Sequence, residues 1–202
     1  MNKTTLLFIF SMLIYSCKEE EGCMDPTALN YNSDASIDNG NCDYAPITNL
    51  NIHFTQTVDN NPLILNSMMY INQIGQNYSV QTVRYLISDI TLHTDNGTST
   101  VLDEVHFIDI SMPSSLTLNI PEINYGNYTS ISFTMGLDSS KNMTNLFVNE
   151  NFFPSFTWPE FLGGGYHYMQ LEGDFNTVFN GYATHTGGTD GMDFSFNKIF
   201  PL

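Results

Sequence analysis

Hydrophobic and polar residues alternate with a period of two over much of this chain, as they do in half-buried β-strands. Leu50, Ile52 and Phe54, for example, are separated by single polar residues. A longer run over 79–93 ends before Asn96-Gly97, a pair that favours a tight hairpin turn. The strands predicted after this turn cover 99–110, 116–120, 128–135, 166–175 and 192–200. Closely spaced strands without helical periodicity predict an all-β domain, an antiparallel β-sandwich over residues 48–202.

One segment interrupts this pattern. Residues 142–165 contain Pro154, Pro159 and three consecutive glycines at 163–165, and they are rich in aromatic side chains. We expect a long loop here, and long loops in compact domains are often functional. The loop over 147–168 is therefore a candidate surface for binding a protein or a glycan.

The first residues predict export. Lys3 precedes an apolar run over 6–15, which is the charged and hydrophobic pattern of a secretory signal peptide. The run ends in Leu-Ile-Tyr-Ser-Cys, which resembles a bacterial lipobox, so we expect a signal peptide over 1–16 and an acylated Cys17. The alternative is an ordinary signal peptide with a chance cysteine. Residues 17–21 form an acidic tether, and its Lys-Glu-Glu-Glu sequence resembles the tag that sends some Gram-negative lipoproteins to the cell surface.

Two cysteines remain once Cys17 is assigned to the lipid anchor. Cys23 and Cys42 are predicted to form a disulfide, because the cell envelope is oxidising. The bridge would close a loop of about twenty residues and stabilise it by roughly 3 kcal/mol. The enclosed segment, 22–44, is rich in Asp and Asn. It has no EF-hand spacing, so we expect capped turns in a disulfide-stapled spacer rather than a Ca²⁺ site.

Composition excludes several functions. The chain has 5 Lys+Arg against 21 Asp+Glu, a formal net charge of −16, which argues against nucleic acid and against electrostatic docking on anionic lipid. We therefore expect membrane contact only through the lipid anchor. No G-x-S-x-G nucleophile motif occurs, and the glycines at 163–165 are not followed by Lys-Ser/Thr. The sequence therefore predicts a binding protein of the outer membrane rather than an enzyme.

Histidines are the candidate metal ligands, because imidazole suits copper, zinc and nickel. The candidates are His53, His106, His167 and His185. No compact spacing such as HxxxH occurs, so a site must be assembled from distant strands, and each histidine alone is more often a hydrogen-bonded strand residue. His167 is expected on the face opposite Tyr166 and Tyr168, and His93, beside the hairpin turn, is expected to be exposed.

Several stretches in order resemble the MbnP-like copper-binding domain, a family named for the methanobactin-associated protein. They are Arg84–Leu92, Val105–Asp109, Phe133–Asp138 with Asn142, Phe156–Trp158, Gly165–Gly173 and Thr184–Gly188. The resemblance covers about residues 48–202. It implies an exported β-sandwich that binds copper through histidines and, in some members, carries an oxidised tryptophan.

Residue by residue, the resemblance extends to His185 and His106, and more loosely to His53. His185 is the first candidate ligand, expected just after a strand and before Gly187, with His106 as the second. The one tryptophan, Trp158, is a candidate modified or site-lining residue. The family often has another Trp shortly before the Gly-Tyr element, where this chain has residues 159–162, so the resemblance does not assign the oxidised position to Trp158.

Two hypotheses follow. The first is an envelope lipoprotein that binds copper for storage, scavenging or delivery. The second is a surface accessory without a metal, which uses the aromatic loop at 147–168 to bind a protein or glycan. Convergence of two or three of the candidate histidines within a few ångströms would favour the first.

Overall fold

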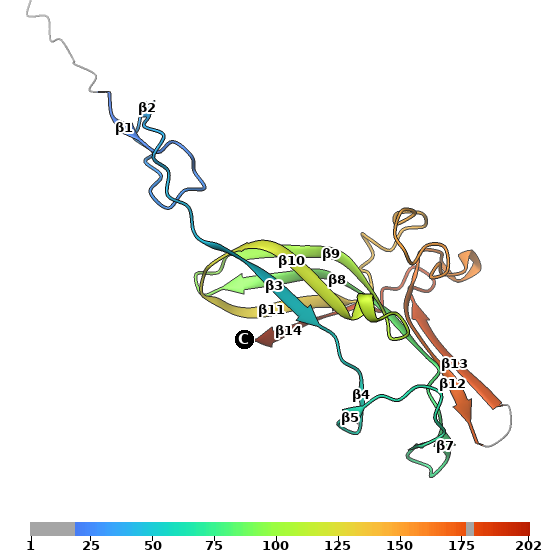
Figure 1. Cartoon of the computed structure of the whole chain (residues 1–202). Helices are drawn as coiled ribbons and strands as arrows, with labels where there is room; N and C mark the ends of the chain where they lie inside the picture. Colours follow the sequence, from blue (N-terminus) through green and yellow to red (C-terminus); the bar gives the residue numbers. More distant parts are fainter. Residues whose placement is uncertain (1–18, 177–179) are drawn as a thin grey trace, which may run out of the picture. The chain divides into compact units, whose positions relative to one another are not determined.

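A computed structural model describes residues 19–176 and 180–202 of the chain (Figure 1). The predicted lipidation site, Cys17, lies outside the described residues. The chain divides into two compact units, 1–46 and 47–202. Within the described ranges, no helix is both long enough and apolar enough to cross a membrane.

The N-terminal unit is held by the predicted disulfide. Cys23 and Cys42 are bonded with an S–S distance of 2.04 Å and their Cα atoms are 5.1 Å apart. The unit contains two short parallel strands, β1 (Glu21–Gly22) and β2 (Ile37–Asp38), and a single parallel bridge between Cys23 and Tyr31.

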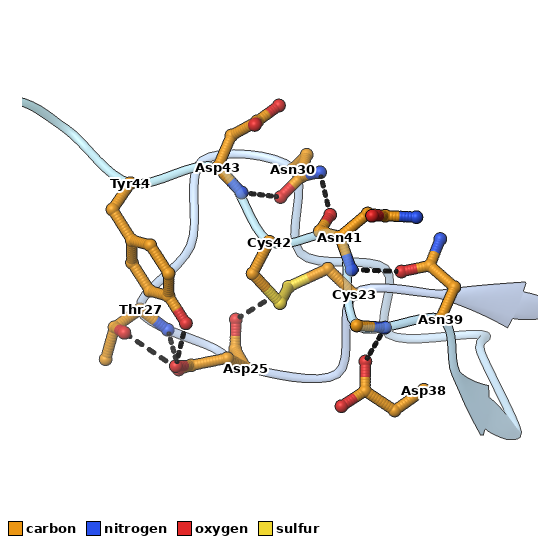
Figure 2. Close-up of a disulfide and its surroundings, with 11 residues drawn as sticks. Cys23, Asp25, Thr27, Asn30, Asp38, Asn39, Asn41, Cys42, Asp43 and Tyr44 are labelled. Atoms are coloured by element: carbon orange, nitrogen blue, oxygen red, sulfur yellow. Dashed lines mark hydrogen bonds between the residues drawn. A yellow bond between two sulfur atoms is a disulfide. The ribbon is translucent and has the colours of Figure 1, made fainter.

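Side-chain oxygens of the N-terminal unit cap its turns, as the sequence predicts. The oxygens of Asp25, Asn32, Asp38 and Asn39 each accept a backbone N–H two residues further on. Asn30 fastens the middle of the loop to the segment around Cys42, because its side chain donates to the carbonyl of Asn41 and accepts the backbone N–H of Asp43 (Figure 2). With so small a core, this unit depends on its bridge and its turns.

The second unit is all-β and antiparallel. Its main strands are β3 (Ile47–His53), β8 (Thr82–Thr94), β9 (Ser99–Asp109), β10 (Thr117–Asn124), β11 (Tyr128–Met135), β12 (His167–Phe175), β13 (Asn180–Gly187) and β14 (Phe196–Pro201). Four two-residue strands also occur: β4 (Thr57–Val58), β5 (Asn61–Pro62), β6 (Tyr70–Ile71) and β7 (Asn77–Tyr78). A short 3₁₀ helix, Pro113–Leu116, precedes β10, and another, Glu160–Leu162, lies in the long loop.

Strand β8 is the centre of the main sheet. It pairs with β9 along one edge, while the other edge is shared by β12, opposite Thr82–Tyr85, and β11, opposite Ile87–Thr94. β14 extends the sheet beyond β11, and β13 extends it beyond β12. The result is a strongly curled half-barrel from which the β12–β13 hairpin extends (Figure 1).

Both faces of β8 are buried, because Leu86 and Ile87 point to opposite sides and both are inaccessible to solvent. On the face of Ile87, the core includes Ile90 and Ile108 and is covered by the separate β3–β10 pair through Ile52 and Leu118. This half of the domain has the two packed sheets that the sequence predicts.

The face of Leu86 differs from the predicted sandwich. Its cover is the loop that follows β11, whose Phe152, Phe156 and Tyr166 are buried against Leu86 and Phe107. The aromatic side chains are large enough to form a core layer without a second sheet. A two-sheet sandwich is therefore an incomplete description, and the aromatic residues predicted as a binding surface are mostly core residues. Phe161, in contrast, is exposed.

Candidate metal centre

A β-bulge in β12 positions His167, one of the four candidate ligands. β12 and β13 pair in regular register from Phe175–Asn180 as far as Met169–Thr186, and the next pair is His167–Gly187. Tyr168 is therefore an extra residue in β12. In a regular strand, His167 would point away from the face that carries Gln170 and Glu172. The bulge instead places His167 opposite Gly187, on the face of β13 that also carries His185.

The sequence prediction for His167 is corrected by this bulge. His167, Tyr166 and Tyr168 are all buried, and the ring of His167 contacts Phe156, which packs in the same core cluster as both tyrosines. Alternation fails here because a bulge changes which face each residue occupies.

His167 and His185 are neighbours on adjacent strands. Their ring centroids are 4.9 Å apart and the rings are nearly perpendicular, at 87°. His167 also contacts the indole ring of Trp158, with centroids 4.6 Å apart, and the ring of Phe156, at 5.4 Å. One side of the His167 imidazole is therefore enclosed by aromatic rings from the long loop, while His185 lies on the more exposed side.

Gly187 makes room for the indole. A Cβ atom at this position would lie 2.7 Å from Cδ2 of Trp158, which is closer than real Cβ contacts. The missing side chain therefore allows Trp158 to lie against β13 and to reach His167.

Two buried polar atoms at this site lack hydrogen-bond partners. They are Nδ1 of His167 and Nε1 of Trp158. Burial, reinforced by the neighbouring His185 and opposed by Glu172, lowers the pKa of His167 to about 4. The ring is therefore neutral near pH 7 and keeps a lone pair free for a ligand.

His185 is held from its outer side by a carboxylate. Its Nε2 lies 2.7 Å from Oε1 of Glu172, on the neighbouring strand. This hydrogen bond is the main reason why the pKa of Glu172 is lowered from its usual value. The carboxylate therefore remains ionised beside the imidazole pair at neutral pH.

The other histidines lie elsewhere. His106 is on β9, separated from β13 by β8 and β12, and its Nε2 lies 2.8 Å from the carbonyl of Ser115. His53 is exposed on β3 and contacts Thr117. His93 is half-buried rather than exposed, because it contacts Ser132 of β11. Of the four candidate ligands, the structure brings together His167 and His185, and it does not bring His106 or His53 to them.

A site with two imidazole ligands suits only metal ions that accept few protein ligands. Across the described ranges, no group of three or more His, Cys, Asp or Glu side chains is arranged to hold a metal ion. Zinc usually takes three or four protein ligands, whereas Cu(I) accepts two neutral imidazoles. The free Nδ1 of His167 fits this chemistry because a metal would satisfy a buried atom that has no other partner.

The fold and this site define an all-β domain with a paired-imidazole centre. The sequence model of the MbnP family matches residues 47–200, and the chain belongs to this family. Among solved structures, MbnP from Methylosinus trichosporium is similar in fold, with a TM-score of 0.58 and 12% sequence identity. The alignment covers 77% of this chain and 72% of that protein. No curated protein matches the chain.

Sequence reasoning missed two features of the site. Glu172 was not a candidate. It lies two residues from Gln170, which pairs with His185, so the two strands together place Glu172 on the same face as His185. β13 itself was not predicted, because it is mostly exposed and polar, and His185 lies within it rather than after a strand.

Proposed function

We propose that this protein is a copper-binding lipoprotein of the cell envelope, which holds Cu(I) between His167 and His185 for storage, scavenging or delivery. The observation that carries the proposal is the 4.9 Å contact between the two imidazole rings at the bulge of β12. Membership of the MbnP family supports copper as the metal, since the sequence resemblance associates this family with copper rather than with an enzymatic reaction.

The surroundings of the pair support a monovalent, soft ion. His167 is buried beside Trp158 and Phe156, a water-poor environment in which the hydration of a small divalent cation would be lost. Two neutral imidazoles satisfy Cu(I) without adding charge. Trp158 is proposed as a residue that lines this site, and its indole N–H would be available to a group bound there.

The copper proposal is tested by metal titration. Under reducing conditions, wild-type protein is titrated with Cu(I) against a chromophoric chelator, alongside His185→Ala and His167→Ala. His53→Ala is the matched control, because His53 is an exposed strand histidine on β3, which belongs to a different sheet from β12 and β13. We expect one tightly bound copper in the wild type and in His53→Ala, and its loss in the other two variants. A wild-type domain that binds no copper would overturn the proposal.

Anchoring through Cys17 is a separate part of the proposal. The lipobox-like sequence that ends at Cys17 supports it, as does the acidic tether that follows. Mass spectrometry of the membrane-extracted protein should find a chain that begins at Cys17 and carries added acyl mass. A mature protein that begins elsewhere without acyl mass would exclude the anchor while leaving the copper site untouched.

A further inference from the structure

We propose that Glu172 is a positioning residue that fixes the imidazole of His185 with its proton on Nε2, so that Nδ1 is the nitrogen that binds copper. This inference rests on the proposed copper function and deepens it, because it assigns one atom of one ligand and the residue that selects it.

The tautomer follows from the contact itself. Nε2 of His185 lies 2.7 Å from Oε1 of Glu172, within hydrogen-bond distance. An ionised carboxylate only accepts hydrogen bonds, so the imidazole nitrogen in this contact must carry the proton. A neutral imidazole has one N–H, so its other nitrogen, Nδ1, keeps the lone pair. Metal-binding histidines commonly donate their other N–H to a carboxylate in this way.

The backbone arrangement makes this contact specific. Glu172 is paired across the strands with Ala183, and His185 is two residues further along β13 on the same face. The small side chain of Ala183 leaves space for the carboxylate to reach diagonally to His185. On its other side, Glu172 is paired with Thr82 of β8. The hydroxyl of Thr82 and the positive charge of Arg84, both from β8, also lower the pKa of Glu172, after the larger effect of His185.

The contacts of Glu172 argue against a role as a copper ligand. Its contact is with His185, and the described residues contain no three-residue metal cluster that would include it. An orienting carboxylate typically changes metal affinity by about 10–100-fold, whereas loss of one of two ligands removes the site.

The test combines a tautomer measurement with a copper titration. In metal-free protein, ¹H–¹⁵N NMR of the histidine rings should show His185 protonated on Nε2, and this preference should be lost in Glu172→Ala. Glu172→Gln should show a weaker preference, because an amide both donates and accepts. Asp174→Asn is the matched control: it removes the same charge two residues along β12, where the carboxylate contacts Gln81 instead of a histidine.

Copper affinity should fall by about 10–100-fold in Glu172→Ala and less in Glu172→Gln, with Asp174→Asn close to wild type. Unchanged affinity and an unchanged tautomer in Glu172→Ala would overturn the inference while the copper function stands. Protonation of His185 on Nδ1 in the wild type would overturn it as well. A wild type that binds no copper would overturn the proposed function and the assignment of Nδ1 as a ligand. In that case, a change of the His185 tautomer in Glu172→Ala would still show that Glu172 orients the imidazole.

Discussion

Gly187 is the residue at which the smallest chemical change should disturb the site most. Its Cα lies against the indole of Trp158, and an added methyl group would meet Cδ2 at 2.7 Å and Cε3 at 2.9 Å. Both atoms belong to a ring that also contacts His167, so relief of the clash must move the ring away from β13 or distort the strand. The aromatic packing and the position of His167 therefore depend on a missing side chain.

Gly187→Ala should lower the free energy of unfolding by about 1–3 kcal/mol, because overpacking forces side chains and backbone to shift. It should also weaken copper binding, because the displaced indole contacts His167. Gly126→Ala is the matched control, since a Cβ there meets its nearest neighbours only at 3.8 Å. Chemical denaturation of both variants measures the difference. Equal stability of the two would mean that the indole does not pack against Gly187 as described.

The buried imidazole of His167 also predicts a pH dependence for the metal-free protein. Its pKa is about 4 in the folded state, lowered mainly by burial, against about 6.5 when exposed. The unfolded chain therefore takes up a proton first as the pH falls below 6.5, and this favours unfolding until the folded state is protonated near pH 4.

Between pH 7.5 and 5, this effect should lower the free energy of unfolding by about 2 kcal/mol. The lowered pKa values of Glu172, Asp138 and Asp193 act in the same direction but below this range. The measurement compares wild type with His167→Gln, in which the dependence should be reduced by about this amount. The same pH dependence in both proteins would show that His167 is not the group responsible.

At the scale of elements, alternation predicted most of the main strands, but it predicted neither β13 nor the irregularities of the others. The long strand at 79–93 and its partner at 99–110 correspond closely to β8 and β9, because both have strong period-two patterns. The bulge at Tyr168 leaves no comparable signal, since three consecutive buried residues with aromatic or imidazole rings fit a strand and a bulge equally well. For this reason, the histidine pair was not predictable: the pairing of His167 with Gly187 depends on one inserted residue.

The aromatic loop shows the same limit. Its prolines and glycines predicted an irregular segment correctly, but composition does not tell whether aromatic side chains point to solvent or into the core. The structure uses them as the second layer over the face of Leu86. Such a layer requires a contact between the loop and a sheet formed by distant strands, which a local pattern does not contain.

Two phenylalanines of this loop provide a direct comparison. Phe156 is fully buried and contacts His167, whereas 84% of Phe161 is exposed. Phe156→Ala should lower the free energy of unfolding by about 3–5 kcal/mol and impair copper binding, because it opens a cavity beneath the site. Phe161→Ala should change stability by less than about 0.5 kcal/mol. Thermal and denaturant unfolding separate the two, and a loss of stability confined to Phe161→Ala would contradict the assignment of Phe156 to the core.

At the scale of the whole molecule, the two units have separate sources of stability. The N-terminal unit depends on one disulfide and on capped turns, while the second unit has a core on each face of β8. The second unit contains all the residues of the proposed copper site: His167, His185, Glu172, Trp158 and Gly187.

Reduction of the Cys23–Cys42 bridge should therefore unfold the N-terminal unit without affecting copper binding. The bridge closes a loop with a sequence separation of 19, and its loss should cost this unit about 3 kcal/mol. Cys23→Ser with Cys42→Ser gives the same test without reductant. NMR signals from 19–46 should collapse toward random-coil positions while those of β8 and β12 remain. Loss of copper binding in this double variant would contradict the independence of the two units.

The position of bound copper is the most direct test. Crystals of the copper-loaded protein, measured on both sides of the copper absorption edge, should show one anomalous peak between the rings of His167 and His185, next to Trp158. A peak beside His106 or His53, or no peak in protein that has been shown to be fully loaded and folded, would contradict the assignment of the metal to this pair.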